Sequence, residues 1–504
     1  MATELALAEV GALLAVAQDH AFAQPPGALL RATVLGQQLA AAAGLSTTEQ
    51  ATTWWTSALR FLGCTGHAFD MAVVFGDEIE MRAESLQADF ASPLDMLRLM
   101  VTHAGPGTAG LNRMRSVLSV LAGGKKAAEM NFRTACEVAD VFAKRLDLDE
   151  AVRSSLRGSF ERWNGRGLPT GAKGEAIPRP MRVAQLSQEF EVLARIEGVP
   201  DALRIIKRRR GRAYDPALCD VVLRDGSAWW DEVEDADPWD AALALAPETP
   251  PLPDDAALEC MLVLADFSDL KSPWLGGHSR AVAELARAAS GQDAERAALV
   301  HDLGRVAVPN VVWDKRSALT RDERDRAEMH TLVTDQLLRR VPFTARLADI
   351  ACAAHERVDA SGYHRRVGSA HLQPAARVLA AADCYQAMLS ERPHRAARSR
   401  EEAADELRKM AANGRLDGEA VEAVLSAAGH RRAAAALPAG LTAREAEVLR
   451  LLALGLTTRE VAERLTITAK TADHHVQHIY GKIGVSTRGA AALFAIESGL
   501  LPAG

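Results

Sequence analysis

Histidine and aspartate side chains are concentrated in the middle of this 504-residue chain. Seven of its 14 histidines lie between positions 278 and 394, and each stands in a segment with helical character. The adjacent pair His301-Asp302 combines an imidazole, which binds one divalent ion, with a carboxylate, which bridges two. Imidazoles and carboxylates from several helices converge on divalent metal in helical bundles. The spacing therefore predicts a metal site assembled from separate helices.

The elements that must position these side chains are predicted to be helices. Apolar residues recur at i, i+3, i+4 and i+7 along most of the chain, and strand-like alternation is scarce. Two breaks in composition, the acidic proline-bearing stretch 231–255 and the short stretch 434–440, divide the chain into three blocks. We expect an all-α protein with domains at 1–245, 255–432 and 438–504.

The first block carries a divergent copy of part of the middle block. When residues 160–193 are set against 355–388 without gaps, Glu161 and Gly167 fall on Glu356 and Gly362. The differences are more informative, because Phe160 faces His355, Asn164 faces Asp359 and Gln188 faces Asp383. The first copy thus lacks groups that bind metal. We expect this block to be a metal-free scaffold or a dimer surface.

Over about 255–430 the chain resembles the HD superfamily of metal-dependent phosphohydrolases, and within it the HD-GYP type associated with cyclic-di-GMP hydrolysis. The HD metal pattern matches His278, His301, Asp302 and Asp383, and the HD-GYP pattern adds His330 and His355. The resemblance implies a divalent metal such as Fe or Mn and gives His301 and Asp302 the catalytic roles. It implies substrate contacts from Arg305, Tyr363, Arg392 and Arg395. The first block is then a degenerate HD-like bundle.

Departures from the family pattern change the number of metal ions that the site is expected to hold. The family's His-His pair is Ala354-His355, its Gly-Tyr-Pro turn is Gly362-Tyr363-His364, and Trp274 stands where variants that bind three metals carry Glu. We expect one well-formed metal position, a weakened second and no third. The module is then either a phosphodiesterase or a sensor that binds metal and nucleotide without turnover.

The last block has the signature of a helix-turn-helix. Two capping-box pairs, Thr442 with Glu445 and Thr457 with Glu460, each open a helix, and a tight turn leads to a longer polar helix. Across 438–500 the block resembles the four-helix LuxR/GerE-type DNA-binding domain, in which the helix corresponding to 468–483 reads the operator and the final helix commonly dimerises. Contacts to double-stranded DNA are expected from Thr468, Lys470, Thr471, His474, His475, Gln477, His478 and Lys482. The alternative is a helix-turn-helix used only for protein contact.

The composition restricts the partners and the cellular location that can be expected for this chain. A net charge of −7 provides no global basic field, so DNA binding must be local. Six scattered cysteines indicate neither disulfides nor a zinc cluster, and Glu9 and Asp19 interrupt the apolar stretch 5–23, so we expect a cytoplasmic protein without a membrane span. The prediction is a homodimeric transcriptional regulator whose middle module binds metal and a nucleotide or cyclic dinucleotide. The alternatives are a phosphodiesterase with a DNA-targeting tail and a constitutive repressor with an inactive pocket.

Overall fold

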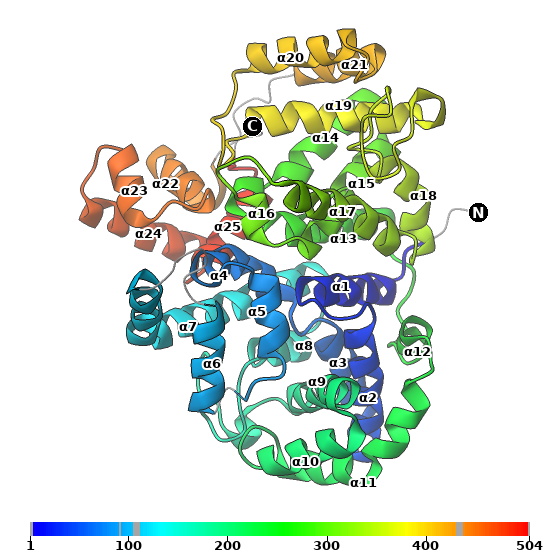
Figure 1. Cartoon of the computed structure of the whole chain (residues 1–504), viewed down its shortest axis with the longest axis vertical. Helices are drawn as coiled ribbons and strands as arrows, with labels where there is room; N and C mark the ends of the chain where they lie inside the picture. Colours follow the sequence, from blue (N-terminus) through cyan, green and yellow to red (C-terminus); the bar gives the residue numbers. More distant parts are fainter. Residues whose placement is uncertain (1–3, 90–91, 104–110, 430–436, 502–504) are drawn as a thin grey trace. The chain divides into compact units, whose positions relative to one another are not determined.

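The computed structural model describes residues 4–89, 92–103, 111–429 and 437–501, and the regular elements in these ranges are all helices (Figure 1). The prediction of an all-α protein is confirmed. Two compact units divide the chain, one at Glu4–Pro253 and the other at Asp254–Gly504. The predicted boundary between 432 and 438 falls mostly on 430–436, outside the described residues.

The unit at Glu4–Pro253 is a bundle built around apolar helices of the first block. Its helices are α1 (Leu7–Ala21), α2 (Ala28–Ala42), α3 (Thr47–Ala58), η1 (Leu62–His67), α4 (Ala68–Phe75), α5 (Glu78–Ser85), α6 (Pro93–His103), α7 (Leu111–Arg145), α8 (Glu150–Arg157), η2 (Gly174–Ala176), α9 (Arg179–Glu197), α10 (Val199–Arg209), α11 (Pro216–Val233) and α12 (Pro238–Ala244).

The unit at Asp254–Gly504 contains a second bundle and the C-terminal tail. The bundle comprises α13 (Asp254–Asp269), η3 (Pro273–Leu275), α14 (His278–Ser290), α15 (Gln292–Val300), η4 (Leu303–Ala307), α16 (Asn310–Trp313), α17 (Arg321–Leu338), α18 (Pro342–Ala351), η5 (Ser369–His371), α19 (Pro374–Leu389), α20 (Arg400–Ala412) and α21 (Gly418–Ala428). The tail comprises η6 (Pro438–Gly440), α22 (Ala443–Ala453), α23 (Thr458–Arg464), α24 (Ala469–Ile483) and α25 (Arg488–Glu497).

Local capping explains where several of these helices begin. Thr442 and Thr457 accept hydrogen bonds from the backbone N–H of Glu445 and Glu460, and each glutamate accepts one from its threonine N–H in return. The same reciprocal pair opens α17 at Thr320. Each pair satisfies two of the N–H groups that a helix start leaves without partners.

Equivalent positions in the two bundles show that both are HD-like and that the first is degenerate. A Cβ on Gly63 of η1 would lie 1.8 Å from the carbonyl oxygen of Ala135, and a Cβ on Gly304 of η4 would lie 2.0 Å from that of His330. Only glycine permits such a close approach. The turn η1 therefore packs on α7 in the first bundle as the turn η4 packs on α17 in the second. Ala135 thus occupies the place of His330.

A second equivalence concerns the start of α2 and α14. Asp19 accepts hydrogen bonds from the N–H groups of Gly27 and Leu29, and Asp269 accepts them from the N–H and the hydroxyl of Ser279. Each aspartate therefore holds the first turn of the helix that follows it, and Ala28 of α2 stands where His278 stands in α14.

No helix in the described part of the chain combines the length and the apolarity that crossing a membrane requires.

Candidate metal centre

Six side chains that the sequence singles out come together in the second bundle, from five different helical segments. His278 is the first residue of α14, and His301 and Asp302 stand where α15 passes into η4. His330 lies in α17, His355 follows α18, and Asp383 lies in α19. All six side chains are at most 7% exposed, so water screens the charges among them only weakly. They form two groups of candidate metal ligands that share Asp302.

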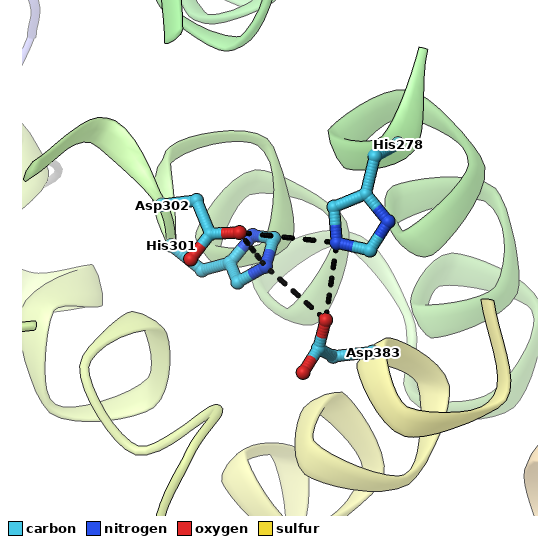
Figure 2. A group of neighbouring side chains, drawn as sticks. All are labelled: His278, His301, Asp302 and Asp383. Atoms are coloured by element: carbon cyan, nitrogen blue, oxygen red, sulfur yellow. Dashed lines mark hydrogen bonds and ion pairs between the residues drawn. The ribbon is translucent and has the colours of Figure 1, made fainter. Parts of the chain in front are cut away.

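The first group consists of His278, His301, Asp302 and Asp383, whose side chains point toward a common centre in Figure 2. His278 Nε2 lies 3.1 Å from Asp383 Oδ1 and 3.8 Å from Asp302 Oδ2. His301 Nε2 lies 3.1 Å from Asp302 Oδ2 and 3.7 Å from Asp383 Oδ1. Two imidazoles and two carboxylates around one centre are a donor set that suits Fe, Mn and similar ions.

The second group uses the other oxygen of the same aspartate. Asp302 Oδ1 lies 3.2 Å from His330 Nε2 and 3.2 Å from His355 Nε2. The His355 ring also approaches the first group, because its Nδ1 lies 3.5 Å from Asp383 Oδ2. Ala354, fully buried, adds no ligand at the neighbouring position. Asp302 is therefore placed to bridge two cations, with fewer protein ligands around the second.

The orientation of the imidazoles fits a metal. The Nδ1–H of His301 donates to the carbonyl of Ala298 at 2.6 Å, and that of His330 donates to the carbonyl of Ala327 at 2.5 Å. A carbonyl oxygen only accepts, so each bond leaves Nε2 as the free coordinating nitrogen. Within the described residues, His301 Nε2, His330 Nε2 and Asp302 Oδ2 are buried without a well-aligned hydrogen-bond partner. A cation held between them would supply the missing partner.

The electrostatics of the centre favour a bound cation. Burial alone raises the pKa of Asp302, but the charges of Arg305 and His301 outweigh it and hold that pKa well below its usual range. Burial lowers the pKa of His278 and of His330 to about 4, so both rings are neutral at pH 7, as metal ligands must be. Burial also acts to lower the pKa of His301, but Asp302 and Asp383 raise it to about 10. Without a metal, a proton on His301 thus supplies positive charge at this centre.

Several supporting residues were not identified from the sequence. Asp269 holds Ser279 and thereby the helix turn that carries His278. The Ser268 hydroxyl donates to the carbonyl of Asp302 at 2.7 Å, and Gly304 N–H donates to the Thr334 hydroxyl at 2.9 Å. Each fixes the backbone beside a ligand. The matching Asp19 in the first copy was the available signal for Asp269, but the gap-free alignment did not reach it.

A cavity of about 370 Å³ opens beside the candidate ligands His355 and Asp383. All three arginines that were predicted to contact substrate line it: Arg305, Arg392 and Arg395. Arg357, which was not predicted from the sequence, lines it as well. Arg305 lies 2.7 Å from Asp302 through Nη2, while its Nε and Nη1 are buried without a partner in the described structure. Guanidinium groups suit phosphate, so this wall of the cavity matches a phosphate-bearing ligand.

Two of the predicted substrate contacts have other partners. Arg395 donates to carbonyl oxygens at the C-terminal end of α19, including those of Met388 and Ser390. Tyr363 does not line the cavity and instead stacks on His355, with ring centroids 5.1 Å apart and planes 10° apart. Tyr363 therefore positions a candidate ligand, and a substrate contact by it stays a prediction.

In the first bundle, a guanidinium occupies the position of the metal centre. The glycine equivalence places Arg60 and Phe61 where the second bundle has His301 and Asp302. Arg60 donates to the side chain of Gln188, which replaces Asp383, and its guanidinium lies 5.2 Å from the Phe61 ring centroid. Burial lowers the pKa of Arg60 to about 10, which leaves it charged at pH 7. A buried guanidinium thus lies where the second bundle gathers its candidate metal ligands.

In the tail, α24, the helix predicted to read DNA, presents most of the predicted DNA contacts to solvent. Lys470, Thr471, His474, Gln477 and His478 are exposed and His475 is partly buried. Thr468 caps the helix, and its hydroxyl is hydrogen-bonded to that of Thr471. Lys482 is engaged elsewhere, since it donates to Glu445 at 2.6 Å and to the carbonyl of Gly440. Its hydrogen bonding lowers the pKa of Glu445 to about 2.

Comparison with known proteins identifies both parts of this unit. Residues 263–420 match the HD domain model, and residues 439–495 match the model of bacterial regulatory proteins of the luxR family. The 3'3'-cGAMP-specific phosphodiesterase 3 of Vibrio cholerae is 30% identical over 407 residues, which cover 78% of this chain and 88% of that protein. A cyclic di-GMP phosphodiesterase of Thermotoga maritima is 30% identical over 179 residues, 33% of this chain and 48% of that protein.

A solved structure supports the fold over most of the chain. The crystal structure of a cyclic GMP-AMP specific phosphodiesterase of V. cholerae, V-cGAP3, superposes with a TM-score of 0.57 at 25% identity and covers 84% of this chain and 98% of that one. The resemblances inferred from the sequence are thereby confirmed. The chain belongs to the HD-domain family that includes the V. cholerae 3'3'-cGAMP-specific phosphodiesterase 3, and it carries in addition a C-terminal domain of the luxR family of bacterial regulatory proteins.

Proposed function

We propose that this protein is a DNA-binding transcriptional regulator whose second HD bundle binds divalent metal and a cyclic dinucleotide. The observation that carries the proposal is Asp302, whose two carboxylate oxygens face two separate groups of buried ligands. The arginine-lined cavity beside these groups suits phosphates. The names of the family's relatives support a cyclic dinucleotide as the phosphate ligand.

Hydrolysis of that dinucleotide is the second candidate function, and the shared position of Asp302 favours it. Two divalent ions held there would polarise the phosphodiester and activate water. Asp302 would hold both ions, His278, His301 and Asp383 would complete the first position, and His330 and His355 the second. Arg305, through its free Nε and Nη1, would orient and neutralise the phosphate.

The two candidates are separated by binding and turnover of 3'3'-cyclic GMP-AMP on manganese-loaded protein. Turnover that disappears in His301→Ala and Asp302→Ala supports the enzyme. If wild type binds the dinucleotide without turnover, and the same two variants lose this binding, the result supports a sensor. Absence of both binding and turnover in protein that carries manganese contradicts the ligand proposal.

For the tail, the exposed polar face of α24 supports insertion into the major groove of duplex DNA. Footprinting of the intact protein on DNA from its own regulatory regions tests this. A footprint abolished by His474→Ala with Gln477→Ala supports base readout. A footprint that persists in the double variant contradicts it. The homodimer and the cytoplasmic location stay predictions.

A further inference from the structure

We propose that Trp274 is the stacking platform for a purine base of the ligand. This inference rests on the proposed function of the second bundle and concerns a residue that takes no part in holding metal. Trp274 lies in η3, four residues before His278, and its side chain lines the 370 Å³ cavity with Arg305 and Arg392. The cavity wall thus combines guanidinium groups with an indole, which are the two kinds of group that bind a nucleotide's phosphate and base.

The backbone around Trp274 is held on both sides. Its N–H donates to the Ser272 hydroxyl, which in turn donates to Asp314 at 2.6 Å. Its carbonyl accepts a hydrogen bond from Arg392 Nη1 at 3.2 Å. One side chain of the predicted phosphate site thereby fixes the segment that carries the indole. With the backbone held, only the side-chain torsions of Trp274 remain to be ordered when a base binds.

The other tryptophan that lines the cavity, Trp313, already packs against neighbouring side chains. The Arg305 guanidinium lies 5.1 Å from the Trp313 ring centroid, and Trp313 Nε1 donates to the carbonyl of Arg305. The edge of the same ring system contacts His330, with centroids 5.3 Å apart. Trp313 therefore supports Arg305 and His330, and its ring is not free for a base.

Trp274, by contrast, offers its ring to the cavity. Its side chain is partly exposed, and among the described residues the indole has no ring contact, no cation–π contact and no hydrogen bond. The apolar side chains of Leu275, Met388 and Met410 line the same cavity. Stacking on an aromatic side chain contributes most for large flat rings, so the platform suits a purine.

The test compares wild type with Trp274→Ala, Trp274→Phe and the control Trp229→Ala, a partly buried tryptophan of the first bundle. Two substrates are used on manganese-loaded protein, 3'3'-cyclic GMP-AMP and methyl p-nitrophenyl phosphate, a phosphodiester without a base. The measured quantity is the ratio of kcat/KM for the dinucleotide to kcat/KM for the simple diester.

We expect Trp274→Ala to lower this ratio by at least about fivefold, through KM of the dinucleotide. Trp274→Phe should keep most of the ratio, and Trp229→Ala should leave it unchanged. A ratio that stays within about twofold of wild type in Trp274→Ala overturns the proposal. Loss of manganese in that variant also overturns it, because the residue would then support His278.

If wild type hydrolyses neither compound, the enzyme candidate fails while the platform is still tested by equilibrium binding. We then expect the dinucleotide to quench tryptophan fluorescence in wild type and to bind at least about fivefold more weakly to Trp274→Ala. Equal binding to both proteins, or no binding to wild type, contradicts the assignment of Trp274.

Discussion

At Asp302, each carboxylate oxygen points to a different pair of imidazoles, and this division determines what each ligand contributes. His278 and His301 lie beside Oδ2, whereas His330 and His355 lie beside Oδ1. Removal of a ligand on one side should therefore affect one ion more than the other. Among the described residues, only Asp302 belongs to both groups.

Replacement of His330 by alanine removes a ligand of the second group and leaves the first group complete. We expect bound manganese to fall from about two ions per chain to about one, and any turnover to be lost, because both ions are needed for the reaction. Metal analysis after gel filtration measures this. Asp335→Asn is the control, since that residue of α17 pairs with Arg339 and Arg365 away from the centre. Retention of both ions in His330→Ala would contradict the assignment.

Arg60 provides a second prediction at the scale of one residue. Arg60→Ala removes a cation that bonds to Gln188 and to carbonyl oxygens of Gln185 and Ser159. We expect the first unit to lose about 2 kcal/mol of unfolding free energy, because buried acceptors lose a charged donor. Denaturant-dependent hydrogen exchange on α9 measures it. Arg204→Ala, which removes a surface pair with Asp201, should cost less than about 0.5 kcal/mol. Equal stability of both variants would contradict the role of Arg60.

At the scale of the helices, the positions of the candidate ligands could be predicted from the sequence. The six candidate ligands stand in five segments whose order matches the HD pattern, so all six could be predicted as a set. The missing ligand at Ala354 could be predicted from the same pattern. The partners of long side chains could not be predicted. Arg395 bonds to the end of α19 and Lys482 bonds to Glu445, and only the packing of neighbouring helices decides this. For the same reason the cation at Arg60 was not foreseen.

Within α24, two lysines should therefore behave differently. Lys470 is exposed, so Lys470→Ala should weaken DNA binding on all sequences and lower the slope of log K against log salt by about one. Lys482→Ala breaks the bond to Glu445 and should mainly destabilise the tail, with a smaller change in slope. Binding titrations at several salt concentrations, with thermal unfolding of each variant, measure both effects. An equal change in slope for the two variants would show that Lys482 leaves Glu445 to contact phosphate.

At the scale of the whole chain, an HD domain and a luxR-family domain follow one another in the sequence. The HD match covers 263–420 and the luxR-family match covers 439–495, both within the unit at Asp254–Gly504. If the ligand regulates the tail, occupancy of the cavity must change the affinity for DNA, and DNA must change the affinity for the ligand by the same factor.

We predict a reciprocal change of at least about fivefold. It is measured by DNA titration of wild-type protein and of Asp302→Asn, each equilibrated with the same manganese concentration, with and without 3'3'-cyclic GMP-AMP. The response should be present in wild type and absent in the variant. DNA affinity that is the same under all four conditions would favour a tail that only localises the protein, or a constitutive repressor.

The claim on which this account depends most is that two ions lie on opposite sides of Asp302. Anomalous X-ray scattering from crystals of the manganese-loaded protein tests it most directly. We predict one peak among His278, His301, Asp302 and Asp383, and a second of lower occupancy among Asp302, His330 and His355. Absence of a peak beside Asp302, or peaks only at other residues, would contradict the account.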